Sequence, residues 1–241
     1  MLSNAEKKWV RSLKQKKVRD GEGLFVVEGV KMVQEALSSK YKVRALYAQS
    51  EDLFTGAKCI SERQMSEVSH FDTPSPALAV VEKSISDLSL PDQSSLYLGL
   101  DSIRDPGNLG TIMRIADWFG IKAIFATVDT VECYNPKVIQ ASMGAIFRVP
   151  IFYVNFSEIF DSLTIPIWGT ALDGVSLYDA NLSTNGVIII GNESNGISLP
   201  LQKKIGCMLK IPSYPNNANG SESLNAAVAT AIICAEFRRR S

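Results

Sequence analysis

The 241-residue sequence contains a single histidine, His70, and only four cysteines. The cysteines stand alone at positions 59, 133, 207 and 234, without the two-residue spacing of zinc ligands. We therefore expect neither a metal site nor a disulfide framework. Any catalytic scheme that pairs a nucleophile with histidine would have to use His70. Because His70 ends a polar helical stretch, we expect it at the surface or at a helix terminus.

Long apolar runs are also missing. No stretch approaches the roughly 18 apolar residues of a membrane span, and residues 1–8 are charged where a signal peptide would be apolar. We therefore expect a cytoplasmic protein with no membrane partner. Hydrophobic residues make up 46% of the chain, which is enough to form real cores. At about 150 residues per domain, the length predicts one large or two modest domains.

The chain has no excess of either charge, since its formal net charge is zero. This balance argues against a wholly basic nucleic-acid-binding protein, but the charges are unevenly distributed. Residues 238–240 are all arginine. Within residues 1–19, Glu6 is opposed by Lys7, Lys8, Arg11, Lys14, Lys16, Lys17 and Arg19. Two interpretations stay open: solvated helix faces, or contacts with the phosphates of an RNA.

Short apolar stretches alternate with helical patterns along the chain. A polar, turn-prone linker over 86–94 divides a domain at 1–85 from a domain at 95–241. In the first domain the sequence predicts a small α/β fold, with a helix over 30–37 and strands at 24–27, 43–48, 58–60 and 78–81. In the second it predicts a doubly wound parallel sheet that binds a nucleotide-type ligand at the carboxyl ends of its strands. Those strands are expected near 96–100, 123–126, 149–152, 167–170, 187–190 and 208–211.

The sequence lacks a Gly-x-Gly-x-x-Gly loop after a strand, which weakens the case for an ordinary Rossmann-type cofactor site. Three other motifs occupy the second half of the chain. The first is Asp-Pro-Gly-Asn-Leu-Gly at 105–110 with Arg114, the second is Gly-Asn-Glu-Ser-Asn-Gly at 191–196, and the third is Ser-Leu-Asn at 223–225. Each motif alone is weak, and their order and spacing carry the specificity.

These motifs give the chain a family resemblance. Together with the strand at 96–100, the stretch at 141–150 and Ile211-Pro212, they make residues 95–240 resemble the SpoU (TrmH-type) branch of the SPOUT superfamily of RNA methyltransferases. Residues 1–80 resemble, more loosely, the ribosomal-protein-like substrate-binding domain that often precedes this fold, chiefly through 23–29. The resemblance implies a parallel-sheet domain with a trefoil knot and a homodimer formed through the C-terminal domain. It also implies S-adenosyl-L-methionine as the cofactor, without a metal.

The implied function is methyl transfer from S-adenosyl-L-methionine to a ribose 2′-hydroxyl of rRNA or tRNA. Two alternatives stay open: a noncatalytic RNA-binding or ribosome-assembly protein of the same fold, and a knotted enzyme that methylates a base. The joint presence of Arg114, Glu193, Ser223 and Asn225 argues against the first alternative. The pairing of the first and third motifs makes the second less expected.

By the resemblance, the site residues fall into two groups. The catalytic residues are Arg114, Asn108, Glu193, Ser223 and Asn225, and the cofactor-binding residues are Gly191, Ile211 and Leu224. Local chemistry offers structural alternatives for several of these residues. Asn108 and Ser223 can each cap a helix, Gly191 can simply end a strand, and Glu193 can be an exposed loop carboxylate.

Arg114 matches the arginine to which the family assigns proton abstraction. A guanidinium has a pKa above about 12, so its deprotonation is very costly. We therefore expect Arg114 to bind the phosphate beside the target ribose and to stabilise the developing alkoxide. The chain departs from the family at 213–220, a longer and Asn-rich loop. Tyr214 in this loop can stack on a base or pack against the protein.

Overall fold

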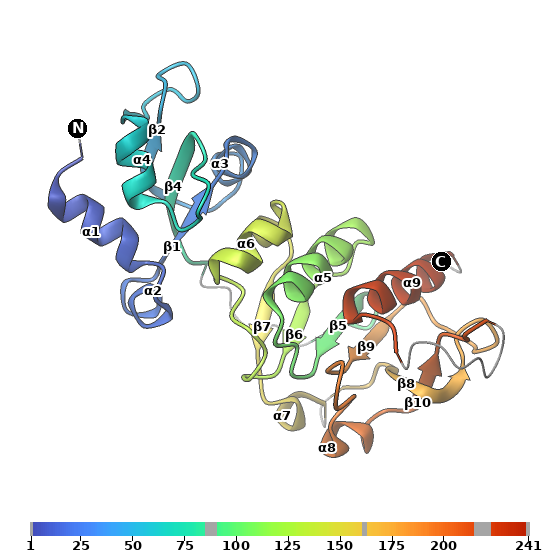
Figure 1. The fold of residues 1–241 in the computed structure, drawn as a ribbon. Coiled ribbons are helices and arrows are strands. Elements are labelled where there is room, and N and C mark those ends of the chain that lie inside the picture. The colour runs from blue at the N-terminus through green and yellow to red at the C-terminus, as the bar shows by residue number, and fades with distance from the viewer. Residues whose placement is uncertain (1, 85–90, 161–162, 215–222, 240–241) are drawn as a thin grey trace. The chain divides into compact units, whose positions relative to one another are not determined.

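The computed structural model describes residues 2–84, 91–160, 163–214 and 223–239 (Figure 1). Chain contacts divide it into two compact units, one formed by residues 1–86 and 133–148, the other by 87–132 and 149–241. The first unit thus includes the segment 133–148, which the sequence-based division placed in the second domain. Of the predicted linker, residues 86–90 lie outside the described residues.

The first unit is a small α/β fold, as the alternating pattern predicted. Its four-stranded sheet has the order β1-β4-β2-β3, in which β4 is antiparallel to both β1 and β2, and β3 is parallel to β2. Its elements are α1 (Asn4–Ser12), α2 (Lys16–Glu22), β1 (Leu24–Glu28), α3 (Val30–Leu37), β2 (Val43–Ala48), β3 (Lys58–Cys59), α4 (Glu62–Val68), β4 (Ala77–Glu82), α6 (Pro136–Ser142) and the 3-10 helix η1 (Ala145–Phe147).

The strands of this unit bury alternate residues on opposite faces of the sheet. On one face, Val10 and Leu13 pack in a cluster with Leu24 and Val26, to which α4 also contributes. On the other face, the Phe25 ring lies 4.7 Å from that of Tyr134, measured between ring centroids. The segment 133–148 therefore completes the core of the first unit.

The prediction of a surface position for His70 is wrong. The residue follows α4, as expected, but its side chain is buried, and its Nε2 lies 3.0 Å from the carbonyl oxygen of Val10. The reason is the buried carboxylate of Glu28, which accepts the backbone N–H of His70 at 2.6 Å and the Ser69 hydroxyl at 2.7 Å. These bonds hold the segment after α4 against the core.

The second unit contains a six-stranded sheet of order β10-β8-β9-β5-β6-β7 in which every neighbouring pair is parallel. This confirms the predicted parallel-sheet domain. The strand β8 continues to Ser176, beyond the predicted 167–170. The elements are β5 (Leu96–Leu100), α5 (Pro106–Trp118), β6 (Ile124–Ala126), β7 (Ile151–Tyr153), α7 (Phe156–Phe160), β8 (Ile167–Ser176), β9 (Gly186–Ile190), α8 (Leu199–Gln202), β10 (Cys207–Lys210) and α9 (Ala226–Arg239).

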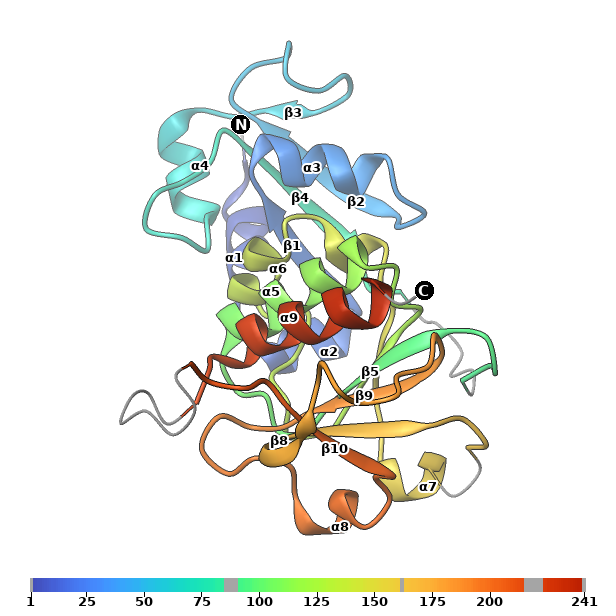
Figure 2. The same cartoon turned by 90° about the vertical axis from the view of Figure 1, so that its right-hand side faces the viewer.

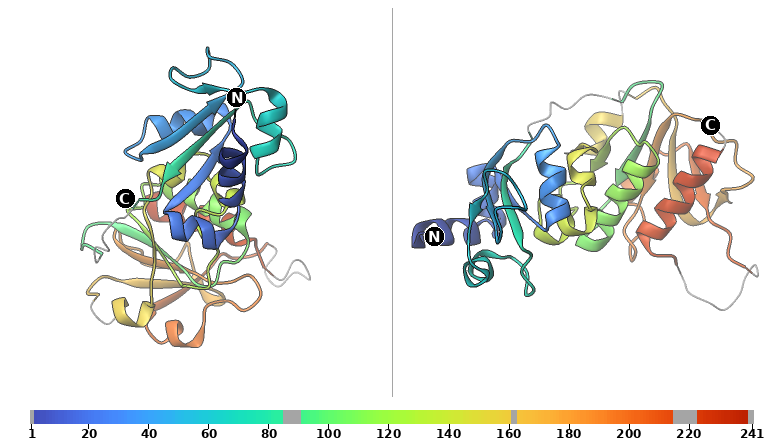
Figure 3. Two further views of the ribbon diagram at one scale, coloured as in Figure 1. Left: turned by 90° about the vertical axis from the view of Figure 1, so that its left-hand side faces the viewer. Right: turned by 90° about the horizontal axis from the view of Figure 1, so that it is seen from above.

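Helices cover both faces of this sheet, with α5 and α9 on one face and α7 and α8 on the other (Figure 2). The helices α5 and α9 pack side by side (Figure 3). Arg238 of α9 donates to the carbonyl oxygens of Phe119 and Gly120 at 2.7 and 2.8 Å, where α5 ends. Arg239 pairs with Glu236 at 2.7 Å, so both arginines have structural partners, and Arg240 lies outside the described residues. No helix in the described part of the chain is long and apolar enough to cross a membrane.

Candidate active site

Two loops begin at the same level of the sheet in the second unit. The central strands β5 and β9 run parallel with Leu100 opposite Ile190, and the N–H of Asp101 donates to the Ile190 carbonyl oxygen at 2.9 Å. The chain leaves β5 into the first motif and β9 into the second. Their loops therefore meet at the carboxyl ends of the strands, where open parallel sheets bind ligands.

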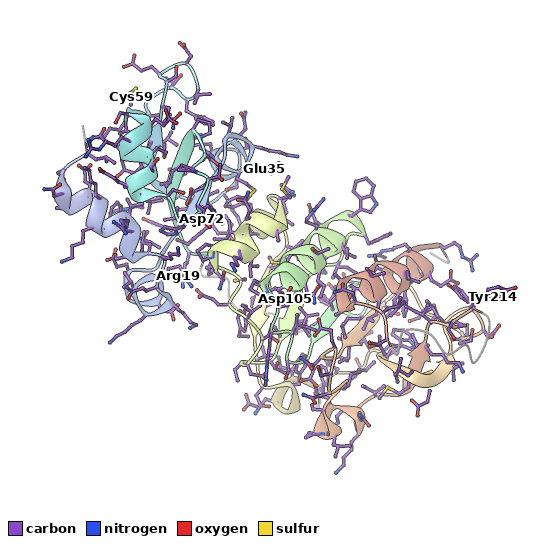
Figure 4. The ribbon with its side chains drawn as sticks, viewed as in Figure 1. Arg19, Glu35, Cys59, Asp72, Asp105 and Tyr214 are labelled. Atoms are coloured by element: carbon purple, nitrogen blue, oxygen red, sulfur yellow. The ribbon has the colours of Figure 1, made fainter. Side chains whose placement is uncertain are left out.

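Asp105 caps the N-terminus of α5 (Figure 4). Its carboxylate accepts the backbone N–H of Asn108 at 2.7 Å. The prediction that Asn108 could cap this helix is therefore wrong, because Asn108 lies inside the first turn and Asp105 satisfies the free N–H. This arrangement leaves the Asn108 side chain free for other partners.

The Asn108 carboxamide joins the three motifs. Its Nδ2 donates to Oε1 of Glu193, and its Oδ1 accepts from Nδ2 of Asn225 at 2.9 Å. An amide can donate and accept at once, so one side chain links loops that lie 85 and 117 residues away in the sequence. We call this set of Asn225, Asn108 and Glu193 the amide chain. It brings together three of the five predicted catalytic residues.

Asn225 also caps α9. Its Oδ1 accepts the backbone N–H groups of Ala227 and Val228 at 3.0 and 3.3 Å. The sequence placed both Ser223 and Asn225 at the start of this helix as residues that can cap it, and Ser223 is an exposed residue two positions before Asn225. One Asn225 side chain thus fixes the start of the helix and contacts the first motif.

The second motif forms a closed loop. Asn192 and Gly196 exchange backbone hydrogen bonds of 3.0 and 2.8 Å. A Cβ on Gly191 would collide with the backbone of Gly196 and Ile197, so the returning loop itself requires glycine at this position. The close approach of the returning loop explains why position 191 is a glycine. The role of Gly191 in cofactor binding stays a prediction.

A second set of bonds ties this loop to the residues between β5 and the first motif, and sequence reasoning missed Asp101 and Ser102. Asn192 Nδ2 donates to the Ser102 carbonyl oxygen at 2.9 Å, and the buried Asp101 accepts the N–H of Ser198 at 2.7 Å. Ser102 adopts a φ of +59°, a conformation that is uncommon for residues other than glycine. The signal was present, since Asp101 is a polar residue directly after a buried strand and Asn192 belongs to a turn-forming sequence.

Arg114 stands apart from the amide chain. It lies six residues after Asn108 on α5, roughly 9 Å along the helix axis, and its side chain is exposed. Among the described residues its guanidinium has no hydrogen-bond or ion-pair partner. It is therefore available for an external anion.

The remaining predicted residues flank the third motif. Ile211 is half-buried after β10, and Leu224 is 47% exposed beside Asn225. Tyr214 is 98% exposed and projects outward in Figure 4, so the alternative that it packs against the protein is wrong for the described chain. Residues 215–222, which include most of the unusual loop, lie outside the described residues. Among the described residues, no three metal-ligating side chains gather into a group that could hold a metal ion.

The fold and the site define a class: an α/β protein whose polar loops meet at the carboxyl ends of a parallel sheet, without a glycine-rich phosphate loop. Comparison with protein families narrows this class. The SpoU rRNA methylase family matches residues 95–235, and the MRM3-like substrate binding domain matches residues 4–79. The chain belongs to the SpoU rRNA methylase family, which confirms the family predicted from its motifs.

Relatives and solved structures agree with this assignment. A 23S rRNA (guanosine(2553)-2′-O)-methyltransferase, RlmP of Bacillus subtilis, is 32% identical over 96% of this chain and 95% of its own length. A TrmH-family protein from Porphyromonas gingivalis superimposes with a TM-score of 0.89 at 36% identity, with both chains fully covered. An AdoMet-bound rRNA methyltransferase from Sinorhizobium meliloti has a TM-score of 0.86 at 31% identity, covering 100% of this chain and 96% of that one.

Proposed function

We propose that this protein transfers a methyl group from S-adenosylmethionine to a ribose 2′-hydroxyl of ribosomal RNA. The observation that carries the proposal is the amide chain, because it assembles residues of all three motifs at the ligand-binding edge of the sheet. The named relatives support rRNA as the substrate. Those from B. subtilis and Streptomyces viridochromogenes are 2′-O-methyltransferases of 23S rRNA that act on guanosine 2553 and uridine 2479. Because these two relatives modify different nucleotides, neither target nucleotide can be assigned to this protein.

The residues at this edge suit an adenosyl cofactor. S-Adenosylmethionine supplies the methyl group on a sulfonium, and the protein has chiefly to align donor and acceptor. We assign the cofactor pocket to Gly191, Ile211 and Leu224. The exposed part of Leu224 offers apolar surface that a nucleoside can cover, and tight loops such as 191–196 offer backbone groups that can bind its polar atoms.

The catalytic groups divide the remaining work. Arg114 binds the phosphate beside the target ribose and stabilises the alkoxide that develops as the 2′-hydroxyl loses its proton to that phosphate or to water. Asn108 orients the Glu193 carboxylate, which forms the wall of the site. Asn225 holds Asn108 from the opposite side, and Ser223 completes the set at the third motif.

The first unit recognises the RNA in this proposal, in keeping with its match to a substrate binding domain. The second unit forms a homodimer and contains the trefoil knot that the family implies. Support for the dimer comes from exposed apolar residues on two neighbouring helices: Trp118 of α5 is 84% exposed and Val228 of α9 is 48% exposed. We place the protein in the cytoplasm, on the basis of its bacterial rRNA methyltransferase relatives.

The test is transfer of tritiated methyl groups from S-adenosylmethionine to unmodified transcripts of 23S rRNA, 16S rRNA and tRNA. We expect label in 23S rRNA and none with Asn108→Ala, because this change removes both bonds of the amide chain. Cofactor binding is measured in parallel by calorimetry. Cofactor binding without transfer to any of these RNAs, tested also on ribosomal particles, would contradict the proposal.

A further inference from the structure

The segment containing α1 and α2 carries more positive charge than its own acids neutralise. Residues 4–22 contain seven lysines and arginines and three acids. Each of the three acids has an ion-pair or hydrogen-bond partner. Glu6 pairs with Lys58 at 2.7 Å, Asp20 pairs with Lys83 and Lys16, both at 2.7 Å, and Glu22 accepts the indole N–H of Trp9 at 2.6 Å.

The hydrogen bonds of two of these acids lower the pKa values of their carboxyl groups. The hydrogen bond from Lys58 lowers the pKa of Glu6 to about 2, and the hydrogen bonds from Lys16 and Lys83 lower that of Asp20 to about 2. Both carboxylates are therefore ionised at neutral pH and committed to these partners.

Three of the seven cations also have structural roles. Lys7 pairs with Glu67 at 2.5 Å, and Lys16 with Asp20. Arg19 is buried and donates to the carbonyl oxygens of Leu13 and Lys14 at 3.0 and 2.7 Å, which fixes the turn between the two helices. The sequence grouped all seven together, and the structure separates these three from the rest.

Four cations remain: Lys8, Arg11, Lys14 and Lys17. All are exposed, and none forms an ion pair within the described part of the chain. They follow one another at three-residue intervals, and Lys8 and Arg11 are neighbours on the surface of α1. The buried Val10 and Leu13 anchor the same segment in the core of the first unit. We call these four residues the basic surface.

We propose that the basic surface binds the phosphate backbone of the substrate RNA, an inference that rests on the proposed function. Four like charges within ten residues repel one another, and nearby acids would ordinarily offset them. Two of the three acids of the segment, Glu6 and Asp20, are paired with other lysines, so neither forms an ion pair with these four cations. A chain of phosphates, each bearing one negative charge, is the polyanion that such a group of exposed cations attracts.

The experiment compares two quadruple variants with equal net charge. One replaces Lys8, Arg11, Lys14 and Lys17 with Gln, and the control replaces four other exposed lysines without ion pairs, Lys31, Lys40, Lys122 and Lys203. Affinity for a 23S rRNA transcript is measured by filter binding between 50 and 200 mM KCl. Circular dichroism verifies that both variants are folded.

A plot of log affinity against log salt has a negative slope, to which each phosphate contact contributes about 0.7. We expect the magnitude of this slope to be smaller by roughly 3 in the basic-surface variant than in the parent. Its affinity then falls about 60-fold less than that of the parent over this fourfold salt range. The control keeps the parental slope. The inference would be overturned if the basic-surface variant and the parent had equal slopes. It would also be overturned if the slope decreased equally in both variants, because an equal decrease reports net charge rather than a local contact.

Methyl transfer separates the inference from the proposed function. At saturating RNA and low salt, the basic-surface variant is expected to keep the parental kcat and show a raised KM for RNA. If no form of the protein transfers methyl groups but the slope changes as expected, the proposed function fails and the RNA-binding surface stands. If methyl transfer is normal and the slope is unchanged, the proposed RNA-binding role of the basic surface is wrong and the proposed methyltransferase function stands.

Discussion

The Asn108 side chain carries two bonds with opposite roles. It donates to a carboxylate on one side and accepts from an amide on the other. An aspartate at this position would face Glu193 with a like charge, and an alanine would remove the bonds to both Glu193 and Asn225. The residue therefore sets the relative position of the second and third motifs.

Arg114→Lys tests the bidentate role of the arginine. Lysine keeps the positive charge but loses the planar fork that matches a phosphate. We expect kcat for methyl transfer to fall by about 100-fold, a typical loss when one donor to a developing oxyanion is removed. The dissociation constant of S-adenosylmethionine should not change. Near-normal turnover by the variant would show that the fork has no role.

At the scale of elements, Asn225 combines the cap of α9 with a bond to the first motif, and two substitutions separate these roles. Asn225→Asp keeps an oxygen for the N–H groups of Ala227 and Val228 but loses the donor to Asn108. We expect kcat to fall while the free energy of unfolding stays within about 0.5 kcal/mol. Asn225→Ala should lose a further ~1 kcal/mol of stability through the missing cap.

Urea unfolding and single-turnover methyl transfer measure the two effects. Equal activity in the parent and Asn225→Asp would show that the bond between Asn225 and Asn108 does not contribute to catalysis. Equal stability in all three proteins would contradict the capping role.

The tie between the first two motif loops gives a second prediction at this scale. Asn192→Asp keeps the acceptor for the N–H groups of Ser194 and Asn195 but loses the donor to the Ser102 carbonyl oxygen. We expect a several-fold weaker affinity for S-adenosylmethionine by calorimetry and a lower kcat, because the loop of Glu193 is less firmly placed. Asn195→Ala, in the same loop, is the control. Parental values for Asn192→Asp would contradict the positioning role.

Some helices, strands and caps could be predicted from the sequence, and others could not. Strands of the second unit followed from short apolar runs such as 96–100 and 187–190, because a buried parallel strand has no polar face. The roles of Asp105 and Asn108 did not follow, because both residues can cap a helix and only the position of the first turn decides between them. The burial of His70 depends on Glu28, 42 residues away, and no local pattern contains that contact.

At the scale of the whole molecule, the proposed homodimer depends on the apolar surface of α5 and α9. Val228→Glu places a charge on that surface, and we expect a dimer in the parent and a monomer in the variant by light scattering. Methyl transfer should be lost in parallel. Leu199→Glu is the matched control, since Leu199 is 73% exposed on α8 across the sheet. A dimeric Val228→Glu variant would place the interface elsewhere.

The stability of the molecule should depend on pH through its single histidine. Burial, followed by the nearby charges of Lys14 and Arg19, holds the pKa of His70 below its usual value. As pH falls below about 6.5, the unfolded chain therefore binds a proton before the folded chain does, and stability is lost. Burial of Glu28 raises the pKa of its carboxyl, so this group acts in the opposite direction.

His70→Gln isolates the histidine contribution, because glutamine can keep a donor for the Val10 carbonyl oxygen. We expect the free energy of unfolding to fall more steeply between pH 7.5 and 5.5 in the parent than in the variant. Urea titrations at both pH values measure this difference. Parallel losses in the two proteins would show that His70 does not titrate as its burial requires.

Alkaline digestion of the labelled RNA distinguishes methylation of ribose from methylation of a base. A 2′-O-methyl group removes the nucleophile that cleaves the adjacent phosphodiester, so the label should appear in alkali-resistant dinucleotides and be absent with Asn108→Ala. Label that appears entirely in mononucleotides would place the methyl group on a base and contradict ribose methylation.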